Sequence, residues 1–358
     1  MKKLDRYIFF RYLGTFFFTV TLLLSIAVVF DVSEKIDDFL EKGAPLKAII
    51  FDYYVNFLVY YGNTFSSLMV FIAVIFFTSK LANNSEFIAM FGSGVSLKRL
   101  LIPYFAAASF LAIGTYYLTN YTIPHTAVDR HAFEAQYLKI PTQDRFRNIH
   151  LQITPNSFLY LESYNSKRQV GYQFALENFD GLELKSKLEA DYLRWNKKDS
   201  LWTLEKMRIR YLQDSTETLV TEGRMDTLFT FGPNDLSQNI YNMETMDRNQ
   251  LKAFVEKATK RGSEVVEFFE IELHQRVAYP ISTYIFTLIA LAIGCRKKRG
   301  GLGVNIALGL IIAVTYVLFM KISITFATNG NLDPAFAVWL PNICFGITGV
   351  LLFINARR

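Results

Sequence analysis

The sequence predicts an α+β membrane protein in which six transmembrane helices flank an antiparallel β domain. Two observations lead to that fold class. Just over half of the 358 residues are hydrophobic, and they gather into long runs instead of spreading along the chain. Between the third and fourth runs, apolar and polar residues alternate, which is typical of half-buried strands. We therefore expect helices in residues 1–123, a β domain with a C-terminal helix in residues 124–270, and helices again in residues 271–358.

Six apolar runs have roughly the 20 residues that a helix needs to cross the hydrocarbon core of a bilayer. The first run follows a basic start, as a signal peptide would, but it ends in Asp31-Val32-Ser33-Glu34 and lacks a small-residue cleavage site. We therefore expect an uncleaved first helix. The expected spans are residues 12–30, 49–79, 100–123, 277–294, 302–328 and 335–355.

The distribution of charge argues against a nucleic-acid-binding protein and predicts the orientation. The net charge is +6, but the basic residues stand at the ends of apolar runs and not on an aromatic-studded soluble face. Lys80, Lys98 and Arg99 fall on the same side as the N-terminus and the basic residues 296–299, whereas residues 327–334 carry no Lys or Arg. The positive-inside rule then places both termini in the cytoplasm and the inserted domain outside.

The inserted domain is predicted to consist mainly of strands. Residues 170–176 and 182–192 alternate between apolar and polar, with an Asp-Gly turn between the two runs. In the next run the alternation slips by one residue between Leu204 and Met207, which predicts a β-bulge. Several short antiparallel strands at this spacing favour a sandwich or jelly roll. A helix is expected over residues 251–258, ending at Gly262.

Residues 79–101 join the second and third spans and predict a short helix, about residues 83–93, at the membrane surface. Asn83, Asn84 and Ser85 offer N-caps, because their side chains can accept first-turn N–H groups. Glu86 follows in the first turn, where a negative charge suits the helix dipole. Two glycines then end the helix, and Ser96 caps the next one. A plain re-entry turn and a peg that docks into a cytoplasmic partner account for these features equally well.

The stretch S-E-F-I-A-M-F-G-S-G-V-S at residues 85–96 resembles the coupling helix of the LptF/LptG permeases, the membrane subunits of the lipopolysaccharide-export ABC transporter. Leu4-Asp5-Arg6-Tyr7-Ile8, which leans toward the LptG member, and Glu272-Leu273-His274-Gln275-Arg276 support the resemblance. It covers essentially the whole chain. The order of the parts, three spans, a β domain and three spans, carries more weight than any single motif.

The resemblance implies one subunit of a larger transporter in the inner membrane of a Gram-negative bacterium. A second LptF/LptG-type permease would pair with this chain, and a cytoplasmic ABC ATPase dimer similar to LptB would bind ATP and Mg. The substrate would be lipopolysaccharide, extracted from the outer leaflet of that membrane. The β-jelly-roll domain would pass it to periplasmic bridge proteins similar to LptC and LptA.

The resemblance also supplies candidate residues for coupling to the ATPase. Glu86 matches the family's coupling-helix carboxylate, which would meet a basic residue of the ATPase in a charge-assisted contact. Phe87, Ile88 and Phe91 would fill a groove of the ATPase, or else rest in the lipid interface.

Candidate substrate-binding residues are cations near the expected outer mouth, which would attract lipid phosphates. They are Lys35, Lys42, Arg130, Arg276 and Lys321. Ion pairs with neighbouring acids, surface solvation, and snorkelling of Lys321 from a buried position explain them as well. The resemblance makes the first and fifth spans lateral gates, with Gly303 and Gly309 allowing close approach. Four aromatic residues of the β domain would line a lipid slot or form plain core: Tyr160, Tyr172, Phe174 and Trp195.

Several chemistries have no motif in the sequence. No phosphate-binding G-x-x-x-x-G-K-[ST] loop occurs, the four histidines lack metal-ligand spacing, and no Ser/His/Asp set stands out. Cys295 and Cys344 offer no disulfide framework. We therefore expect a transport permease without a cofactor or ATPase site of its own. The alternatives are a permease of another envelope-lipid or lipoprotein exporter, a membrane-anchored enzyme that modifies the envelope, and an envelope scaffold.

Overall fold

The computed structural model describes residues 3–138, 145–197, 199–213, 216–236, 240–260, 266–296, 301–330 and 332–356 of the chain. The chain divides into two compact units. A helical unit comprises residues 1–140, 244–248 and 270–358, and a β unit comprises residues 141–243 and 249–269. Each unit has a hydrophobic core of its own.

Six helices of the helical unit are long and apolar enough to cross a membrane, which confirms the number expected for the part of the chain described. They are α1 (Lys3–Glu41), α4 (Ser66–Asn83), α6 (Leu97–Tyr117) with its continuation, α10 (Val266–Gly294), α11 (Gly301–Thr328) and α12 (Pro334–Ala356). The shorter elements are α2 (Leu46–Ala48), the π-helical η1 (Ile49–Tyr54), α3 (Val55–Thr64), α5 (Glu86–Gly92), the π-helical η2 (Leu118–Thr122) and α7 (Ile123–Tyr137).

The ends of the first three spans differ from those expected. α1 continues to Glu41 and the chain reverses at Gly43, whose φ is 60°, so most of residues 31–47 is helix and not loop. The second expected span is divided at Phe65 into α3 and α4. The third continues from α6 through η2 into α7 as far as Tyr137. Apolar length alone cannot show such extensions, because their residues are partly polar.

α4 is the central helix of the helical unit. Thirteen of its eighteen residues are buried, and small residues on its neighbours allow close approach. A Cβ atom at Gly294 of α10 would lie 3.0 Å from Thr78, and one at Gly309 of α11 would lie 2.8 Å from Ile75. Gly309 therefore packs within this chain. A Cβ atom at Gly303 would meet open space, so the close approach expected there is not observed among the described residues.

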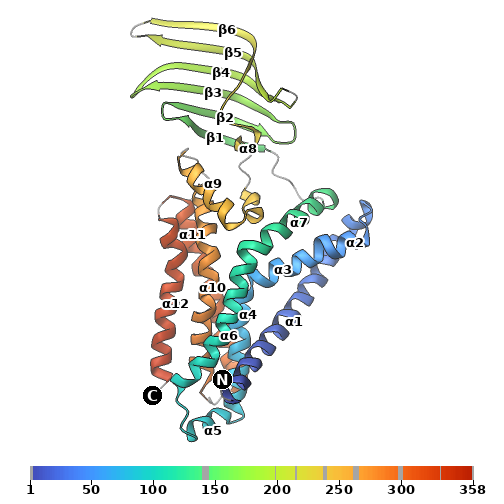
Figure 1. The fold of residues 1–358 in the computed structure, drawn as a ribbon, viewed down its shortest axis with the longest axis vertical. Coiled ribbons are helices and arrows are strands. Elements are labelled where there is room, and N and C mark those ends of the chain that lie inside the picture. The colour runs from blue at the N-terminus through green and yellow to red at the C-terminus, as the bar shows by residue number, and fades with distance from the viewer. Residues whose placement is uncertain are drawn as a thin grey trace. The chain divides into compact units, whose positions relative to one another are not determined.

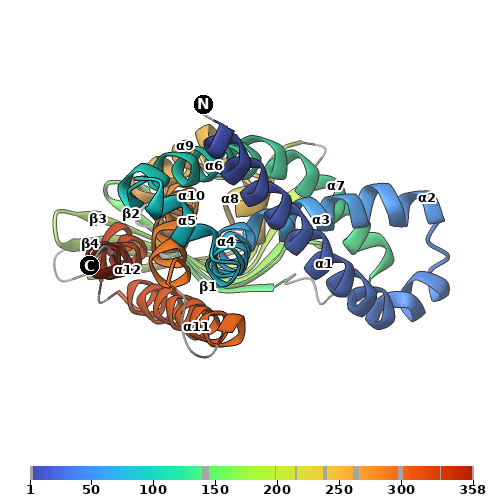
Figure 2. The same ribbon diagram turned by 90° about the horizontal axis from the view of Figure 1, so that it is seen from below.

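α1 runs along one side of the helical unit and is most deeply buried near its two ends (Figures 1 and 2). Ile8, Tyr12 and Phe16 are buried near its start, and Phe39 is buried near its end. No residue from 17 to 38 is buried. The middle of α1 is only partly covered, although Val20 and Leu23 still pack on the core and Leu24 lies 3.2 Å from the Cβ position of Gly62 in α3.

The β unit contains one antiparallel sheet in the order β1-β2-β3-β4-β5-β6. Its strands are β1 (Arg145–Thr154), β2 (Ser157–Asn165), β3 (Val170–Asp180), β4 (Glu183–Asn196), β5 (Leu201–Gln213) and β6 (Thr216–Thr227), and the helices after them are α8 (Pro233–Leu236), η3 (Ile240–Thr245) and α9 (Arg248–Lys260). The antiparallel β domain is confirmed. The described strands form a single meander, however, and not the two packed sheets of a sandwich or jelly roll. α9 confirms the helix near residue 251, and Gly262 lies outside the described residues.

A crease crosses the sheet. Side chains of a regular strand face the core at every second position, but at one level of this sheet buried positions are three residues apart. The pairs are Leu161 and Tyr164, Gly171 and Phe174, Ala190 and Leu193, and Leu204 and Met207, which lie opposite one another in β2, β3, β4 and β5. Gln173 and Lys206, which lie within two of these intervals, have φ angles of 52° and 56°.

The crease explains the slip in the sequence pattern between Leu204 and Met207. β5 pairs with β4 and with β6 without a shift in register, so the predicted bulge is not present. In each of these strands the burial pattern shifts by one residue at the same level. The strands therefore keep their pairing register across the crease. A single strand's sequence cannot distinguish this arrangement from a bulge, because both place two successive side chains away from the core.

We predict that Gly171→Val destabilises the β unit by about 1–3 kcal/mol, the usual cost of overpacking a core. A Cβ atom at Gly171 would lie 2.8 Å from Cδ1 of Leu161, which is fully buried. Urea unfolding of the full chain, followed by fluorescence of Trp195 and Trp202, measures the effect. Gly223→Val in β6 is the matched control, since its Cβ atom meets nothing within 4 Å. Equal stability of the two variants would contradict the packing described.

Candidate functional site

α5 is a seven-residue helix that joins α4 to α6 at one end of the helical unit, which we call the α5 end (Figure 1). Ser85 precedes it with a φ of 61°, and its side chain makes no capping hydrogen bond, so the expected side-chain cap is absent there. Gly94, with a φ of 83°, follows the helix. Ser96 caps α6 as expected, because its hydroxyl accepts a hydrogen bond from the Arg99 N–H at 3.3 Å.

The apolar residues of α5 divide between two faces. Phe87 and Met90 are buried in the core of the helical unit. Ile88 and Phe91 are 61% and 42% exposed. The expectation that Phe87 docks into a partner is therefore not supported by its position, because it anchors α5 to its own chain. Ile88 and Phe91 belong to the exposed face of α5.

Two polar contacts tie the start of α1 to the segment around α5. The Tyr7 hydroxyl donates a hydrogen bond to Oε2 of Glu86 at 3.0 Å. The guanidinium of Arg99, at the start of α6, pairs with the buried carboxylate of Asp5 at 2.7 Å. Both contacts involve the first turns of α1, one from Glu86 of α5 and one from Arg99 of α6.

A second cluster lies at the opposite end of the helical unit, the α7 end, around Arg130. Its guanidinium pairs with Glu244 at 2.6 Å and with Glu134 at 3.4 Å, and it lies 4.3 Å from the centre of the Tyr60 ring. Tyr60 donates a hydrogen bond to Glu244 at 2.8 Å, and His131 lies 3.3 Å from the same carboxylate. The cluster holds two carboxylates and one permanent cation, so it offers little net attraction to a phosphate.

The pKa of Glu244 is lowered from its ordinary value. Burial acts to raise this pKa, but hydrogen bonds from His131 and Tyr60, with the charge of Arg130, outweigh that effect. A lowered folded-state pKa stabilises the fold above the ordinary glutamate pKa. The contribution is lost as the pH falls through the lowered value, so acid loosens this cluster.

Residues 244–248, which return from the β unit, are held to the helical unit at three points. Glu244 binds Arg130 as described. Arg276 of α10, whose side chain is 2% exposed, donates to the Met246 carbonyl oxygen at 2.7 Å and to Glu272 at 2.9 Å. Arg248 lies 5.9 Å from the Tyr116 ring. Arg130 and Arg276 therefore fasten this segment to the helical unit.

A family model for the lipopolysaccharide export system permeases LptF and LptG matches residues 6–355. The chain belongs to the LptF/LptG family. It is accordingly a multi-pass protein of the inner membrane and a permease of lipopolysaccharide export, and it is not an enzyme in its own right. No curated protein matches the chain significantly.

The lysines that the family resemblance made candidates are placed differently from one another. Lys35 pairs with Asp31 at 2.6 Å and also donates to the Tyr53 hydroxyl. Lys42 is exposed, and its ammonium lies 3.4 Å from the carbonyl oxygen of Leu138. Lys321 is exposed on α11 and not buried, contrary to the expectation. The structure does not gather the five candidate cations into one site.

Two of the four candidate aromatic residues of the β unit belong to its core. Phe174 is 1% exposed and Trp195 packs against the same cluster. Tyr160 and Tyr172 are half-buried and lie outside that cluster. Phe174 and Trp195 are therefore explained by packing within the unit.

The contacts that sequence reasoning missed join segments of the chain that are distant in sequence. Tyr7 and Asp5 belong to the stretch that carried the family resemblance, but nothing local shows that they contact Glu86 and Arg99. Glu244 lies 114 residues from Arg130. A hint is that α7 ends in a polar stretch containing Arg130, because a cation near a membrane surface needs a partner or water.

We predict that Arg130→Met lowers the stability of the full chain by on the order of 2 kcal/mol, the value for a hydrogen bond to a charged group. The variant leaves Glu244 without its guanidinium, and adding Glu244→Gln restores part of the loss. Thermal unfolding in detergent measures both. The control is Arg194→Met, which breaks an exposed pair with Glu205 and is expected to change stability by less than about 1 kcal/mol. Unchanged stability of Arg130→Met, with loss of bound lipopolysaccharide, would favour a substrate site instead.

Proposed function

We propose that this chain is one permease subunit of an ABC transporter that extracts lipopolysaccharide from the inner membrane, driven by a separate cytoplasmic ATPase. The observation that carries the proposal is the contact between Glu86 of α5 and Tyr7 of α1. It joins the surface on which an ATPase would act to a helix whose middle is only partly covered by the rest of the unit.

In this proposal α5 is the coupling helix. Ile88 and Phe91 enter a groove of the ATPase, and the carboxylate of Glu86 meets a basic residue there, in a charge-assisted contact. Phe87 and Met90 keep α5 fixed to the core, so that a push from the partner moves α5 as a rigid piece. Glu86 and Arg99 pass the displacement to α1, which opens or closes the lateral path for lipid.

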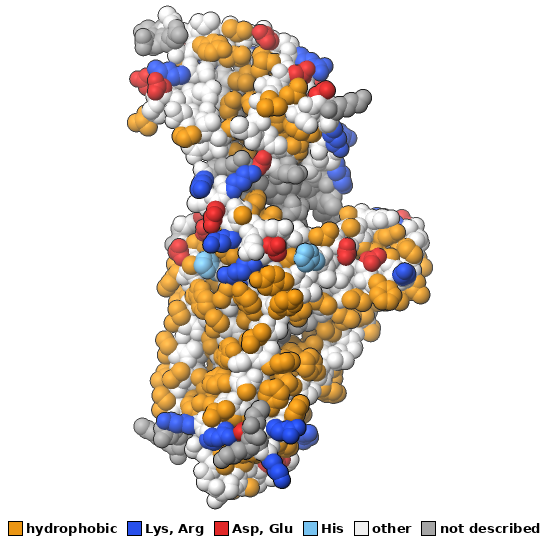
Figure 3. Space-filling model, in the orientation of Figure 1, with side chains coloured by type: hydrophobic (Ala, Val, Ile, Leu, Met, Phe, Trp, Pro, Cys, Tyr) orange, Lys and Arg blue, Asp and Glu red, His pale blue; other side chains and the backbone are white. Residues whose placement is uncertain are grey.

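The proposed orientation places the α5 end in the cytoplasm. Figure 3 shows a hydrophobic band on the helical unit between Lys and Arg side chains at the α5 end and mixed charges at the α7 end. Cations at the α7 end such as Arg130 and Arg276 pair with carboxylates. Lysine and arginine in excess favour the cytoplasmic side. The β unit is then periplasmic, and both termini are cytoplasmic.

The β unit is proposed to receive the lipid and to pass it to similar domains of partner proteins, in the roles of LptC and LptA. Within the described strands, β1 and β6 each have one neighbour, so the sheet presents two edges. Exposed edges accept further strands through main-chain hydrogen bonds. Lys42 and Lys321, which are exposed, are the candidate cations best placed to meet lipid phosphates. A second LptF/LptG-type permease would pair with this chain, and the acyl chains of the substrate would enter an apolar cavity between the two. The ATP and Mg belong to the ATPase, and this chain is proposed to need no cofactor.

We predict that Glu86→Arg abolishes recovery of the ATPase when tagged full-length protein is captured from its native membranes. Reversal of the charge opposes a basic residue of the partner and removes the bond to Tyr7. Wild-type protein is expected to bring down an ABC ATPase, a second six-span permease and lipopolysaccharide. Lys98→Glu, an exposed charge reversal at the start of α6, is the matched control and should leave the ATPase bound.

Tyr7→Phe separates transmission from docking. It removes one hydroxyl and leaves the α5 surface intact, so the ATPase should be recovered normally. Lipopolysaccharide extraction by the reconstituted complex should fall by about tenfold, the effect of about 1.4 kcal/mol. Failure to recover any ATPase with the wild-type protein would show that α5 is only a turn.

A further inference from the structure

A pocket of about 320 Å³ lies between α1 and α3. α1 lines it with residues between Leu23 and Glu34, and the facing wall is made by Phe57 and Tyr61 of α3 and by Phe65, which follows α3. Residues three or four positions apart share one face of a helix, so the pocket lies between two facing stripes. Its volume falls at the lower end of the range of roughly 300–1,000 Å³ that is typical of ligand pockets.

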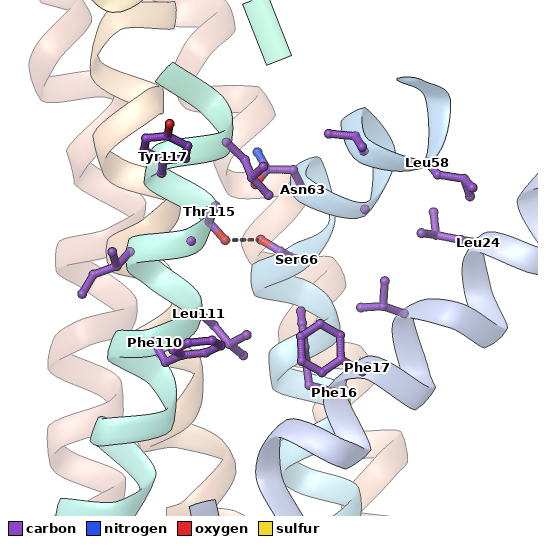
Figure 4. A pocket seen from close by; sticks show the side chains of 16 residues that line it. Phe16, Phe17, Leu24, Leu58, Asn63, Ser66, Phe110, Leu111, Thr115 and Tyr117 are labelled. Carbon is purple, nitrogen blue, oxygen red and sulfur yellow. Dashed lines mark hydrogen bonds between the residues drawn. The ribbon is translucent and has the colours of Figure 1, made fainter. Parts of the chain in front are cut away.

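The pocket is apolar at one end and acidic at the other. α1 carries no charged residue from Tyr12 to Phe30, and Asp31 and Glu34 follow. These two carboxylates line the pocket beyond its apolar residues, which belong to the uncharged run. An apolar cavity of about 610 Å³ shares Leu24 with the apolar end and continues toward Phe16 (Figure 4). A molecule with an apolar tail and a polar head therefore matches the pocket.

The charge at the acidic end selects a cation. The described lining residues include no Lys or Arg. Lys35 pairs with Asp31 at 2.6 Å, and two tyrosine hydroxyls donate to the same carboxylate, so Asp31 is already compensated. The exposed carboxylate of Glu34 makes no hydrogen bond or ion pair within the described part of the chain. Residues 31–41 hold five carboxylates and one lysine, so a cationic head is attracted here and an anionic head is repelled.

The aromatic wall favours an organic cation over a metal ion. The ring centroids of Phe57 and Tyr61 are 4.4 Å apart, and those of Tyr61 and Phe65 are 6.2 Å apart. A cation near the face of an aromatic ring is attracted by the quadrupole of the ring. The Tyr61 hydroxyl makes no hydrogen bond to another described residue, so it can accept one from an N–H group. The described residues nowhere bring three possible metal ligands together. The pocket thus offers an ammonium group an anion, a hydrogen-bond acceptor and an aromatic surface.

We propose that this pocket binds an amphiphile that carries an alkylammonium head. The ammonium group lies beside Glu34 and Tyr61, and the alkyl chain runs along Leu23, Leu24 and Ala27 toward the apolar cavity. The head stands where the uncharged run of α1 ends, which is the level at which the hydrocarbon core of a bilayer gives way to its head groups. This binding requires neither ATPase coupling at α5 nor export.

The test uses the full-length protein in an uncharged detergent, with two photoreactive probes at trace concentration. One probe is dodecylamine with a diazirine in its chain, and the other is dodecanesulfonate with the same diazirine. After illumination, mass spectrometry locates the adducts. The amine should label residues 23–34 and 57–65 about fivefold more than the sulfonate does, which is the factor that one partly exposed ion pair or one cation–π contact allows.

Single substitutions separate binding in the pocket from general electrostatic attraction. Glu34→Lys should reverse the preference, so that the sulfonate labels these residues more than the amine does. Asp37→Lys is the matched control, since Asp37 is exposed on α1 and does not line the pocket. It should change labelling by less than about twofold. Tyr61→Leu keeps an apolar wall, and it should lower labelling by the amine about threefold while labelling by the sulfonate stays unchanged.

Competition by unlabelled lipids identifies the source of the ammonium group. Displacement of the amine probe by phosphatidylethanolamine would assign the pocket to a bilayer lipid. Displacement only by lipopolysaccharide whose phosphates carry ethanolamine would assign it to the exported substrate.

Three results would overturn the proposal. They are equal labelling of the wild-type protein by the two probes, an equal change with Asp37→Lys and Glu34→Lys, and equal displacement by lipids that carry no amine, such as phosphatidylglycerol or unmodified lipopolysaccharide. None of them depends on whether an ATPase binds at α5, so the proposed coupling could fail while this site stands.

Discussion

The helical unit depends on the close packing of α4 against its neighbours. Lipid tails are as apolar as leucine, so membrane helices gain little from hydrophobic burial and associate through tight contacts and hydrogen bonds. Thr78 binds Tyr104 of α6 at 2.9 Å, and Ser79 accepts a hydrogen bond from Asn305 of α11 at 3.0 Å. With the glycines of α10 and α11, these contacts fix a rigid centre. Any part that moves during transport must therefore lie outside it.

α1 is the helix that meets this requirement. Its start is joined to the rigid centre, since Tyr12 hydrogen-bonds to Thr287 of α10 at 2.8 Å, and to the α5 region through Tyr7 and Asp5. Its far end packs through Phe39 against Tyr53 and the residues around it. Between these attachments it borders a cavity. A long helix that is buried at its ends and only partly covered along its middle has fewer contacts to break there than α4 has along its length.

The number of membrane spans and the presence of antiparallel strands could be predicted from the sequence. Few of the long-range contacts could be. Apolar runs gave six spans because each must match the bilayer, and period-two alternation gave the antiparallel strands. The ends of α1 and α7 were missed because these helices continue beyond the hydrocarbon core. The ion pairs and hydrogen bonds of Arg130 and Arg276 were not predicted, since their carboxylate and carbonyl partners at residues 244–246 become neighbours only through the fold. Lys321 was expected to be buried because the surrounding run is apolar, yet apolar residues on α11 face outward.

The crease in the sheet is a feature that the sequence of one strand indicated but could not explain. The slip at Leu204 and Met207 was visible in one strand, and a bulge was the simplest local explanation. Only the pairing of all the strands shows that β2, β3 and β4 slip at the same level, with Gln173 and Lys206 at positive φ. A crease that keeps every ladder in register bends the sheet without exposing hydrogen bonds. The buried positions therefore continue from strand to strand across the crease.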